Sequence, residues 1–594
     1  MSYELKELVF DEEFVEKINT AFADLRADYE LELDESKEQI EKLKAVHIDI
    51  GNNLSNLVSY SIVSSGKISG LRGTGKTHLF LMARNQINNE IFDKKVFAVY
   101  LNVKRVHFPK ECDQEIFNRV FSMYLYDEVA KQLGLLFRDI YGNSAKDKIL
   151  SLFKKDERKL CNSIKKALQQ VALFQAIIKS GSKEYLNLDK GQISSEDMFR
   201  ELVEQSVKII ASVNPKEAKI SVEDMLKEIE ETCEKIQKDN TYLAYLNIND
   251  VRDQLVGLIK TLNLMGITFY VDEWEKLYTI PEAQKYLAAY IDKIIDDPFY
   301  FWIGMVPHRG GVYCLDVGAD LQHVINLDEQ LIYEKSSYSR DICINYFKKF
   351  IDKRLNMYAH EYGINYKLLF NEDKKLEQLV LASMGNSRDF GTMLLSCWSS
   401  FKEYRTNALA QGRPFKYISY EMIKESIKED GKIKLSNIEN DDGVMRLWGD
   451  LNRYCAEKKS SHFAIKEIPE TTEQINSHYF SELIYHRLLH FRMGHIAAKD
   501  PNVLEKLSIY ALSYSGTYDA HDIDKKFTYV ITPEVIHDRV RRYIYDPVEI
   551  INSIKISEGN TIKCKTCGEI IDTVKMKVAF DKNFCPYCGG NLYW

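Results

Sequence analysis

The sequence has 594 residues, which at roughly 150 residues per domain corresponds to about four domains. Charged residues make up 28% and hydrophobic residues 45% of the chain, a balance that excludes a disordered chain, a collagen and a coiled-coil rod. The 80 Lys and Arg residues against 88 Asp and Glu give a formal net charge of −8, so any contact with nucleic acid must come from a local basic patch.

The sequence also predicts a compartment. The first residues are acidic and amphipathic, unlike a secretion signal, which has a basic stretch followed by an apolar one. No apolar run reaches the roughly 18 residues that a membrane span needs, and the nearest, Val256–Val271, contains Lys260. Only four of the eleven cysteines are clustered, which is typical of a reducing compartment and one metal site. We therefore expect a cytoplasmic protein without a membrane partner.

In chain order, residues 1–50 carry two helical patterns with acidic faces, as expected of a docking arm or the start of a domain. From Ile62 to Leu81 the pattern changes to a short strand, a glycine-rich turn and a helix. The continuous apolar run Val96–Val103 is typical of a buried parallel strand. Between Glu115 and Lys260 apolar residues recur at helical spacing and only Pro215 interrupts, so this block is expected to be helical with solvated charged faces.

Strand patterns return at Ile267–Val271 and Phe299–Val306, and residues 328–402 have helical stripes of leucine and aromatic residues. From Tyr479 to Tyr545 the pattern indicates two helices, a polar loop and a β-like run at Lys526–Pro533. No internal repeat is evident, which disfavours a solenoid.

The segment Gly70-Leu-Arg-Gly-Thr-Gly-Lys-Thr77 matches G-x-x-x-x-G-K-[ST] and lies between a strand pattern and a helix pattern. In this motif backbone N–H groups surround the phosphates, Lys76 reaches the β and γ phosphates, and Thr77 offers an oxygen to Mg²⁺. Arg72 would face the nucleotide, a neighbouring protomer or solvent. The predicted ligands of ATP are Gly70, Arg72, Gly73, Thr74, Gly75, Lys76, Thr77, His78 and, through Mg²⁺, Asp272.

A phosphate loop needs a carboxylate at the end of a neighbouring strand, and the run Ile267-Thr-Phe-Tyr-Val-Asp-Glu273 provides two. Asp272 is predicted to hold Mg²⁺ through water, and Glu273 to polarise the attacking water. Thr77 and Asp272 are 272 − 77 = 195 residues apart, so a large helical insertion must lie within the α/β core.

These residues, together with Gly385-Asn-Ser-Arg388, resemble the AAA+ ATPases, in particular the branch with origin-recognition and replication-initiator ATPases and the STAND signalling ATPases. The resemblance covers roughly residues 50–405. It implies that Arg388 is the sensor 2 arginine of a helical lid and contacts the γ-phosphate. Ser387 stands where the family pattern has proline.

The same resemblance puts Tyr300–Val306 in the place of the sensor 1 strand. Arg309, which follows this strand, would then sense the γ-phosphate, and His308 is a second candidate. The alternative is an arginine at a strand end that pairs with surface acids. No arginine finger acting on a neighbouring copy is identified, so assembly into a ring or filament is an analogy.

The region from Glu482 to Val540 resembles a winged helix, as found after the lid in replication-initiator ATPases. A basic helix-like stretch, His486–His495, would come first, and a hairpin wing would end at Tyr529–Pro533. Positive charge follows at Arg539, Arg541 and Arg542. Winged helices bind DNA or serve as protein interfaces, and both kinds of partner stay open.

The cysteine pairs Cys564-Lys-Thr-Cys567 and Cys585-Pro-Tyr-Cys588 are separated by 585 − 567 − 1 = 17 residues. Four thiolates at these intervals suit a tetrahedral Zn²⁺ site in a zinc ribbon, and the closed set leaves no position for a substrate. From Lys555 to Lys582 six lysines accompany four acids. This patch is weakly basic, so a stabilising or protein-docking role is at least as well supported as nucleic-acid contact.

The patterns together predict an α/β protein with a P-loop NTPase (AAA+-like) parallel sheet. The expected domains are an N-terminal helical arm (1–50), a P-loop ATPase core (51–114 and 261–327), a helical insertion (115–260), a helical lid (328–405), a winged-helix-like region (406–550) and a zinc ribbon (551–594).

The predicted function is an ATP-hydrolysing switch or assembly ATPase that couples nucleotide state to a partner protein or DNA. It would act as a homo-oligomer or with a separate effector. The resemblance adds anti-phage defence or a mobile element as the setting. The alternatives are a scaffold that holds ATP without turnover and an ATPase that loads DNA in replication or transposition.

Overall fold

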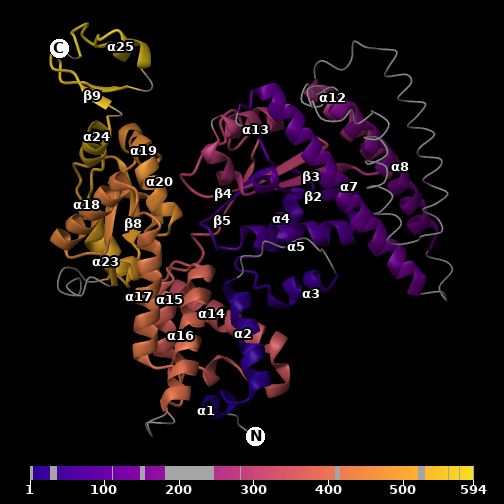
Figure 1. Ribbon diagram of the computed structural model, residues 1–594, viewed down its shortest axis with the longest axis horizontal. Helices are drawn as coiled ribbons and strands as arrows, with labels where there is room; N and C mark the ends of the chain where they lie inside the picture. The colour runs from indigo at the N-terminus through magenta and orange to yellow at the C-terminus, as the bar shows by residue number, and fades with distance from the viewer. Residues whose placement is uncertain are drawn as a thin grey trace, which may run out of the picture.

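The computed structural model describes residues 4–26, 37–109, 111–146, 154–180, 246–280, 282–408, 415–518, 529–559, 561–573 and 576–592. Figure 1 shows an α/β body, a helical lid beside it, a C-terminal domain above the lid, and a small module at the C-terminal end of the chain. Within the described residues, none of the helices combines the length and apolar content that crossing a bilayer requires.

The α/β body is built on a five-stranded parallel sheet in the order β2-β3-β4-β1-β5. Its strands are β1 (Gly66–Ser69), β2 (Val96–Asn102), β3 (Gly266–Asp272), β4 (Phe299–Met305) and β5 (His323–Asn326). The predicted strands are therefore confirmed, and their apolar runs reflect burial on both faces. Sequence patterns missed β5, which is a four-residue edge strand with a single buried residue.

Helices cover both faces of this sheet. On β2, Val96, Ala98 and Tyr100 pack with α4 (Asn53–Ser61) and α5 (Lys76–Asn89). The alternate residues of β2 face the other side and pack with α7 (Gln114–Lys146), α8 (Lys154–Ser180), α12 (Ile248–Leu262) and α13 (Ala283–Asp292). The helical insertion thus supplies the second covering layer of the sheet in its described parts, while residues 181–245 lie outside the described residues. This arrangement is an α/β P-loop NTPase fold with added helical regions.

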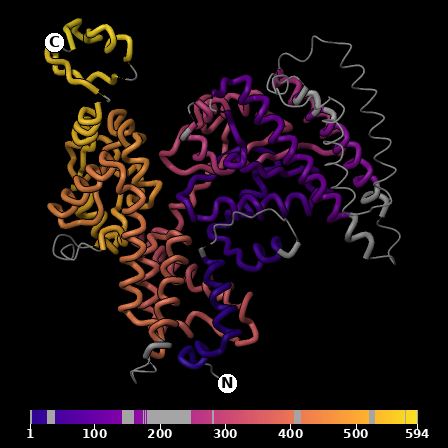
Figure 2. Tube along the Cα trace, viewed as in Figure 1, coloured from indigo at the N-terminus to yellow at the C-terminus, as the bar shows by residue number. Residues whose placement is uncertain are grey.

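The region predicted as the helical lid, called the lid below, contains α14 (Ser337–Tyr358), α15 (Asp373–Ala382) and α16 (Ser387–Ala408). The N-terminal helix α2 (Glu12–Arg26) packs into the same hydrophobic core, with Phe14, Phe22 and Leu25 fully buried among lid residues. Figure 2 shows this indigo helix lying against the orange and pink lid helices. Helix α3 (Lys37–Val46) then bridges α14 and α5, so the N-terminal segment joins lid and α/β body.

The C-terminal domain begins with α17 (Tyr420–Ser436), which packs on α16 of the lid. Its core contains, in chain order, α18 (Asp442–Lys458), β6 (His462–Lys466), α19 (Pro469–Ile475), α20 (His478–Tyr485), β7 (Leu489–Ala497) and β8 (Lys506–Leu512). The strands form an antiparallel sheet in the order β6-β8-β7. Helices α21 (Tyr514–Tyr518), α23 (Pro533–Asp538) and α24 (Val548–Ser557) complete the domain.

Two predictions for this domain are wrong. Most of the stretch predicted as a basic helix, His486–His495, belongs to strand β7, because its backbone pairs with β8 and its Arg492 is buried against Glu334 rather than exposed. The predicted hairpin wing does not end at Tyr529–Pro533: residues 529–532 form no strand, and Pro533 begins α23. Residues 526–528 of that run lie outside the described residues. The hairpin of the domain is instead formed by β7 and β8.

The last module contains an antiparallel pair, β9 (Thr561–Lys563) and β10 (Ile570–Asp572), and the short helix α25 (Lys577–Asp581). Its small core is formed by Cys564, Ile571, Cys585 and Leu592. Such a core is too small to hold a module together without a metal or a covalent link.

The shorter elements of the chain are α1 (Leu5–Leu8), α6 (Ile91–Lys94) and the 3₁₀ turns η1 (Val103–Arg105), η2 (Trp274–Thr279), η3 (His360–Tyr362), η4 (Tyr366–Leu368) and η5 (Val540–Arg542).

Candidate functional site

The loop between β1 and α5 has the backbone that a phosphate-binding loop requires. Gly73 and Gly75 have φ values of +87° and +98°, which residues with a side chain rarely adopt. A Cβ on Gly73 would also lie 2.4 Å from the Cβ of Arg388. Lys76 begins α5, and its Nζ donates to the carbonyl oxygens of Gly70 and Leu71 at 2.6 and 3.2 Å. The amino group therefore lies over the loop, at the positive end of a helix.

The hydroxyl of Thr77 and the carboxylate of Asp272 meet although they are 195 residues apart. Thr77 Oγ1 donates to Asp272 Oδ2 at 2.6 Å, and Tyr100 OH donates to the same oxygen at 2.8 Å. Burial, and then the neighbouring charge of Glu273, raise the pKa of Asp272. A hydroxyl and a buried carboxylate are oxygen ligands of the kind that Mg²⁺ prefers, and a cation here would offset the cost of the buried charge.

Glu273 follows directly and is strained. Its φ of +62° is unusual for a residue other than glycine, and such conformations cluster at functional sites. Its carboxylate faces the cavity above the phosphate loop, and its Oε2 is buried without a hydrogen-bond partner among the described residues. Trp274, next in the chain, is fully buried and donates to Gly311 O at 3.2 Å, so it belongs to the core.

A second glutamate, Glu275, lines the same cavity and was not identified from the sequence. Burial raises its pKa, and its Oε2 also has no hydrogen-bond partner among the described residues. The sequence signal was the Asp-Glu pair at the end of the strand. This pair does not indicate that a third acid, on the 3₁₀ turn that follows, also lines the cavity.

The lid reaches the phosphate loop through the segment Gly385–Arg388. Asn386 Nδ2 donates to the carbonyl oxygen of Arg72 at 2.7 Å, while Asn386 Oδ1 accepts from the backbone N–H groups of Arg388 and Asp389. Asn386 therefore caps α16 and ties it to the loop. Ser387 is the first residue of α16, a position where proline is also well tolerated. Serine in place of the family's proline is therefore compatible with the same backbone conformation.

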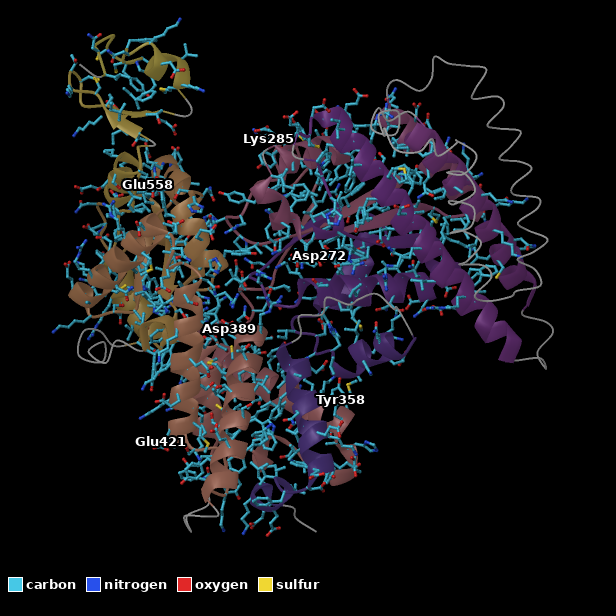
Figure 3. The ribbon with its side chains drawn as sticks, viewed as in Figure 1. Asp272, Lys285, Tyr358, Asp389, Glu421 and Glu558 are labelled. Carbon is cyan, nitrogen blue, oxygen red and sulfur yellow. The ribbon has the colours of Figure 1, made fainter. Side chains whose placement is uncertain are left out.

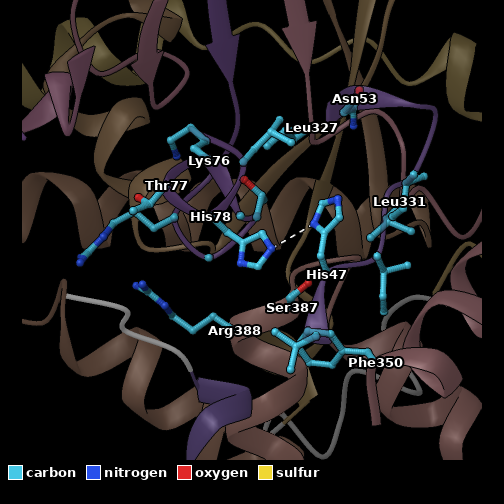
Figure 4. A pocket seen from close by; sticks show the side chains of 18 of the residues that line it. His47, Asn53, Lys76, Thr77, His78, Leu327, Leu331, Phe350, Ser387 and Arg388 are labelled. Atoms are coloured by element: carbon cyan, nitrogen blue, oxygen red, sulfur yellow. Dashed lines mark hydrogen bonds between the residues drawn. The ribbon is translucent and has the colours of Figure 1, made fainter. Parts of the chain in front are cut away.

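These groups surround one cavity of about 210 Å³ (Figure 4). Lys76 and Thr77 lie on one side of it and Arg388 on the side of the lid. The far end is apolar and is lined by Ile48, Ile50, Leu327, Leu331 and Phe350, among others. A phosphate-binding end and an apolar end together suit a nucleotide, with the base against the apolar wall.

A histidine pair lies between the two ends of the cavity. His47 Nδ1 and His78 Nε2 are 3.0 Å apart, joined by the dashed line in Figure 4. Burial lowers the pKa of both rings, that of His78 to about 3, so both are neutral at physiological pH. His47 Nε2 is buried without a hydrogen-bond partner among the described residues. The loop after α3 that carries His47 has no sequence motif, which is why His47 was not predicted.

Most of the predicted nucleotide ligands come together at this cavity. Its lining includes Arg72, Gly73, Thr74, Gly75, Lys76, Thr77, His78, Glu273 and Arg388. Gly70 and Asp272 lie directly behind the lining, the first packed on Thr74 and the second bonded to Thr77.

Arg309 does not line the cavity. Its guanidinium forms an ion pair with Glu482 of α20 at 2.5 Å and stacks on the ring of Tyr485, 3.9 Å from the centroid. His308 Nδ1 lies 2.9 Å from Asn476 Oδ1. Arg72 lines the cavity but also faces the C-terminal domain, with its guanidinium 5.3 Å from the centroid of Tyr485.

The predicted basic residues of the C-terminal domain have different environments. Arg541 donates to the carbonyl oxygens of Ala497 and Ala498, at the end of β7, whereas Arg539 and Arg542 are exposed. Helix α20 contains no lysine or arginine.

Four cysteines of the last module converge. The Sγ atoms of Cys564, Cys567, Cys585 and Cys588 all lie within 4.8 Å of one another, with two of the residues buried and two exposed. Sγ atoms from the two C-x₂-C pairs are 3.7 Å apart, both for Cys564–Cys588 and for Cys567–Cys585. This is the only group of three or more such ligands among the described residues, and a tetrahedral ion bound by four thiolates fits it.

Neither a family model nor a curated protein sequence matches the chain. Among solved structures it is similar to the Aeropyrum pernix ORC2 protein in ADPNP and ADP complexes, at 10% identity and a TM-score of 0.33, covering 90% of this chain and 98% of that one. It is also similar to the Aeropyrum pernix ORC1 protein in complex with DNA (13%, TM-score 0.30, 80% and 94%) and to a Walker-type ATPase of Pyrococcus abyssi (11%, TM-score 0.33, 80% and 95%).

Proposed function

We propose that the protein is an AAA+-type ATPase that binds and hydrolyses Mg²⁺·ATP and works as a nucleotide-dependent switch. The observation that carries this proposal is the hydrogen bond between Thr77 of the phosphate loop and Asp272 at the end of β3, beneath a cavity that Glu273 and Arg388 also line. A loop that merely held an anion would need neither a buried carboxylate below it nor a second one above it.

Each residue has a distinct role in this proposal. Lys76 and the backbone N–H groups of the loop bind the phosphates, and Thr77 with Asp272 would hold Mg²⁺, which neutralises phosphate charge when bound. Glu273 accepts a hydrogen bond from the attacking water and orients it toward the γ-phosphorus. Arg388 stabilises the charge on the γ-phosphate oxygens. Cleavage of the bond between the γ-phosphorus and its bridging oxygen then gives ADP and inorganic phosphate.

The finer assignment, to the origin-recognition and STAND-like branch, is supported by the motif Gly385–Arg388 at the cavity and by the C-terminal domain that follows the lid. The order helix, strand, helix, helix, strand, strand from α18 to β8 supports a winged helix, with α20 as its third helix and β7–β8 as its wing. The four cysteines support a zinc ribbon at the end of the chain.

A protein is the better supported partner of the C-terminal domain. Five of the eight residues of α20 are buried and none is lysine or arginine, whereas a helix that reads DNA presents basic and polar side chains to the groove. The exposed Arg539 and Arg542 beside the wing favour DNA as the second candidate. A role in anti-phage defence or in a mobile element rests on the family resemblance, and the neighbouring genes would test it.

The test compares ATP binding and turnover of the wild type with Lys76→Ala, with and without duplex DNA. Loss of the phosphate-binding amino group is expected to lower turnover by about 10²–10³-fold, the usual effect of removing one such group. Lys260→Ala is the matched control, since Lys260 is an exposed lysine on α12 and does not line the cavity. Binding of ATP without turnover under every condition would support the scaffold alternative and reject the switch.

A further inference from the structure

The C-terminal domain touches the nucleotide-binding body through α20. This helix is held by Glu482, which pairs with Arg309, and by Asn476 just before it, which bonds to His308. Leu71 of the phosphate loop and Val306 at the end of β4 are buried in the hydrophobic core of the same domain. The domain therefore packs directly against the phosphate loop and the end of β4.

Tyr485, at the end of α20, gathers cations from three separate loops. Arg309 stacks on its ring, Arg72 lies 5.3 Å from the centroid, and Lys276 Nζ lies 5.8 Å from the centroid and 3.1 Å from the hydroxyl oxygen. These residues follow β4, β1 and β3, whose carboxyl ends are level in the sheet. They are the loops that a bound triphosphate would contact.

Glu482 is the anion that balances this cluster. Burial by itself raises its pKa, but the hydrogen bond from His486 and the charge of Arg309 hold the pKa of Glu482 below its usual range. The carboxylate is thus ionised and competes with any other anion for Arg309. A γ-phosphate carries more charge than a carboxylate and accepts hydrogen bonds from a guanidinium, and Arg309 Nε is buried without a hydrogen-bond partner among the described residues.

Ion pairs also join the C-terminal domain to the lid. Arg487 pairs with Asp389 at 2.8 Å and Arg492 pairs with Glu334, all of them largely buried. Figure 3 shows Asp389 where the lid meets the C-terminal domain, separate from Asp272 in the α/β body. The lid segment Gly385–Arg388 keeps its own contact with the phosphate loop, through Asn386 and the carbonyl oxygen of Arg72, so α20 is a separate contact between the C-terminal domain and the body.

We propose that Glu482 and Tyr485 form a clamp that competes with the γ-phosphate of ATP for Arg309, so that ATP but not ADP loosens α20 from the nucleotide-binding body. If the protein binds ATP as proposed above, the clamp is the contact through which the bound nucleotide affects the C-terminal domain. Linkage requires reciprocity: if ATP weakens the clamp by some factor, breaking the clamp must tighten ATP by the same factor.

The test measures, on the full chain, the affinity for a non-hydrolysable ATP analogue and for ADP in the wild type and in Glu482→Gln. The substitution keeps the shape but removes the charge that holds Arg309. We expect the analogue to bind on the order of tenfold more tightly to Glu482→Gln, with ADP affinity unchanged. The matched control is Glu470→Gln, an exposed acid on α19 of the same domain.

Hydrogen exchange provides a second readout that does not depend on affinity. Segments 306–311 and 483–488 face each other across the clamp, and both are expected to exchange faster in wild type with the ATP analogue and in Glu482→Gln without nucleotide. Equal affinity and equal exchange in wild type and Glu482→Gln would overturn the clamp and leave the ATPase proposal standing. Failure of the analogue to bind any variant would instead overturn the ATPase proposal.

Discussion

Two arginines, both expected at the γ-phosphate, occupy different environments. Arg388 lies at the cavity, on a helix whose first turn is capped by Asn386 two residues earlier. Arg309 lies outside it, held by Glu482 from a domain 173 residues further along the chain. The first position is set by local backbone geometry and the second by a long-range contact. A short motif can predict the first kind of position, but not the second.

The same distinction applies to the cysteine module and gives the largest expected effect. Its four thiolates are placed by two local turns, so the module should depend on the metal and on nothing else in the chain. We predict that Cys564→Ser abolishes binding of one Zn²⁺ and unfolds residues 561–592, because structural Zn²⁺ contributes roughly 10 kcal/mol or more to such modules. Metal content and hydrogen exchange of the module measure this effect.

ATP affinity is expected to be unchanged in Cys564→Ser, as it should be in the control Cys314→Ser, which alters an exposed single cysteine of the α/β body. A drop in ATP affinity on zinc loss would mean that the module is coupled to the site, and the contrast between local and long-range features would fail.

The two arginines should also differ when each is removed. Arg388→Ala is expected to slow ATP turnover by about 10²-fold with little loss of stability, as for other transition-state donors. Arg309→Ala leaves Glu482 half-buried without its cation and is expected to lower the free energy of unfolding by about 2 kcal/mol. Turnover assays and denaturant unfolding separate the two effects, with the exposed Arg542→Ala as control. Equal effects of the two substitutions on both measurements would contradict the contrast.

A smaller effect concerns pH and compares the two regions directly. Burial lowers the pKa of His78 in the nucleotide site and of His490 in the C-terminal domain, each to about 3. Between pH 6.5 and 3 the unfolded chain therefore binds more protons than the folded one, so stability present above pH 6.5 is lost as the pH falls. We expect about 1–2 kcal/mol lost per histidine between pH 7 and 5.

Denaturant unfolding at pH 7 and pH 5 tests this. In His490→Gln, the loss of stability that comes from the histidine of the C-terminal domain is expected to disappear. A variant that keeps the full pH dependence would show that this histidine is not buried in neutral form. His360, which is exposed on the lid, provides a control substitution without an expected effect.

The sequence predicted features that local residues determine better than features that depend on long-range contacts. The apolar runs at Val96–Val103 and Ile267–Val271 predicted their strands correctly, and the glycines of the segment Gly70–Thr77 predicted the turn between β1 and α5, because each depends on its own few residues. The stretch His486–His495 was wrongly predicted as a basic helix, since its pairing with β8 and the burial of Arg492 against Glu334 depend on distant residues. His47 and Glu275 were missed for the same reason, because only the folded chain brings them to the cavity.

The measurement that tests the central claim most directly is the rate of ATP hydrolysis by Glu273→Gln, with ATP affinity measured alongside. If Glu273 orients the attacking water, turnover falls by about 10²–10⁴-fold while ATP still binds as in the wild type. Glu275→Gln, which removes the neighbouring acid of the same cavity, is predicted to keep most of the activity. Unchanged turnover in Glu273→Gln, or a wild type that binds ATP and never hydrolyses it, would contradict the account.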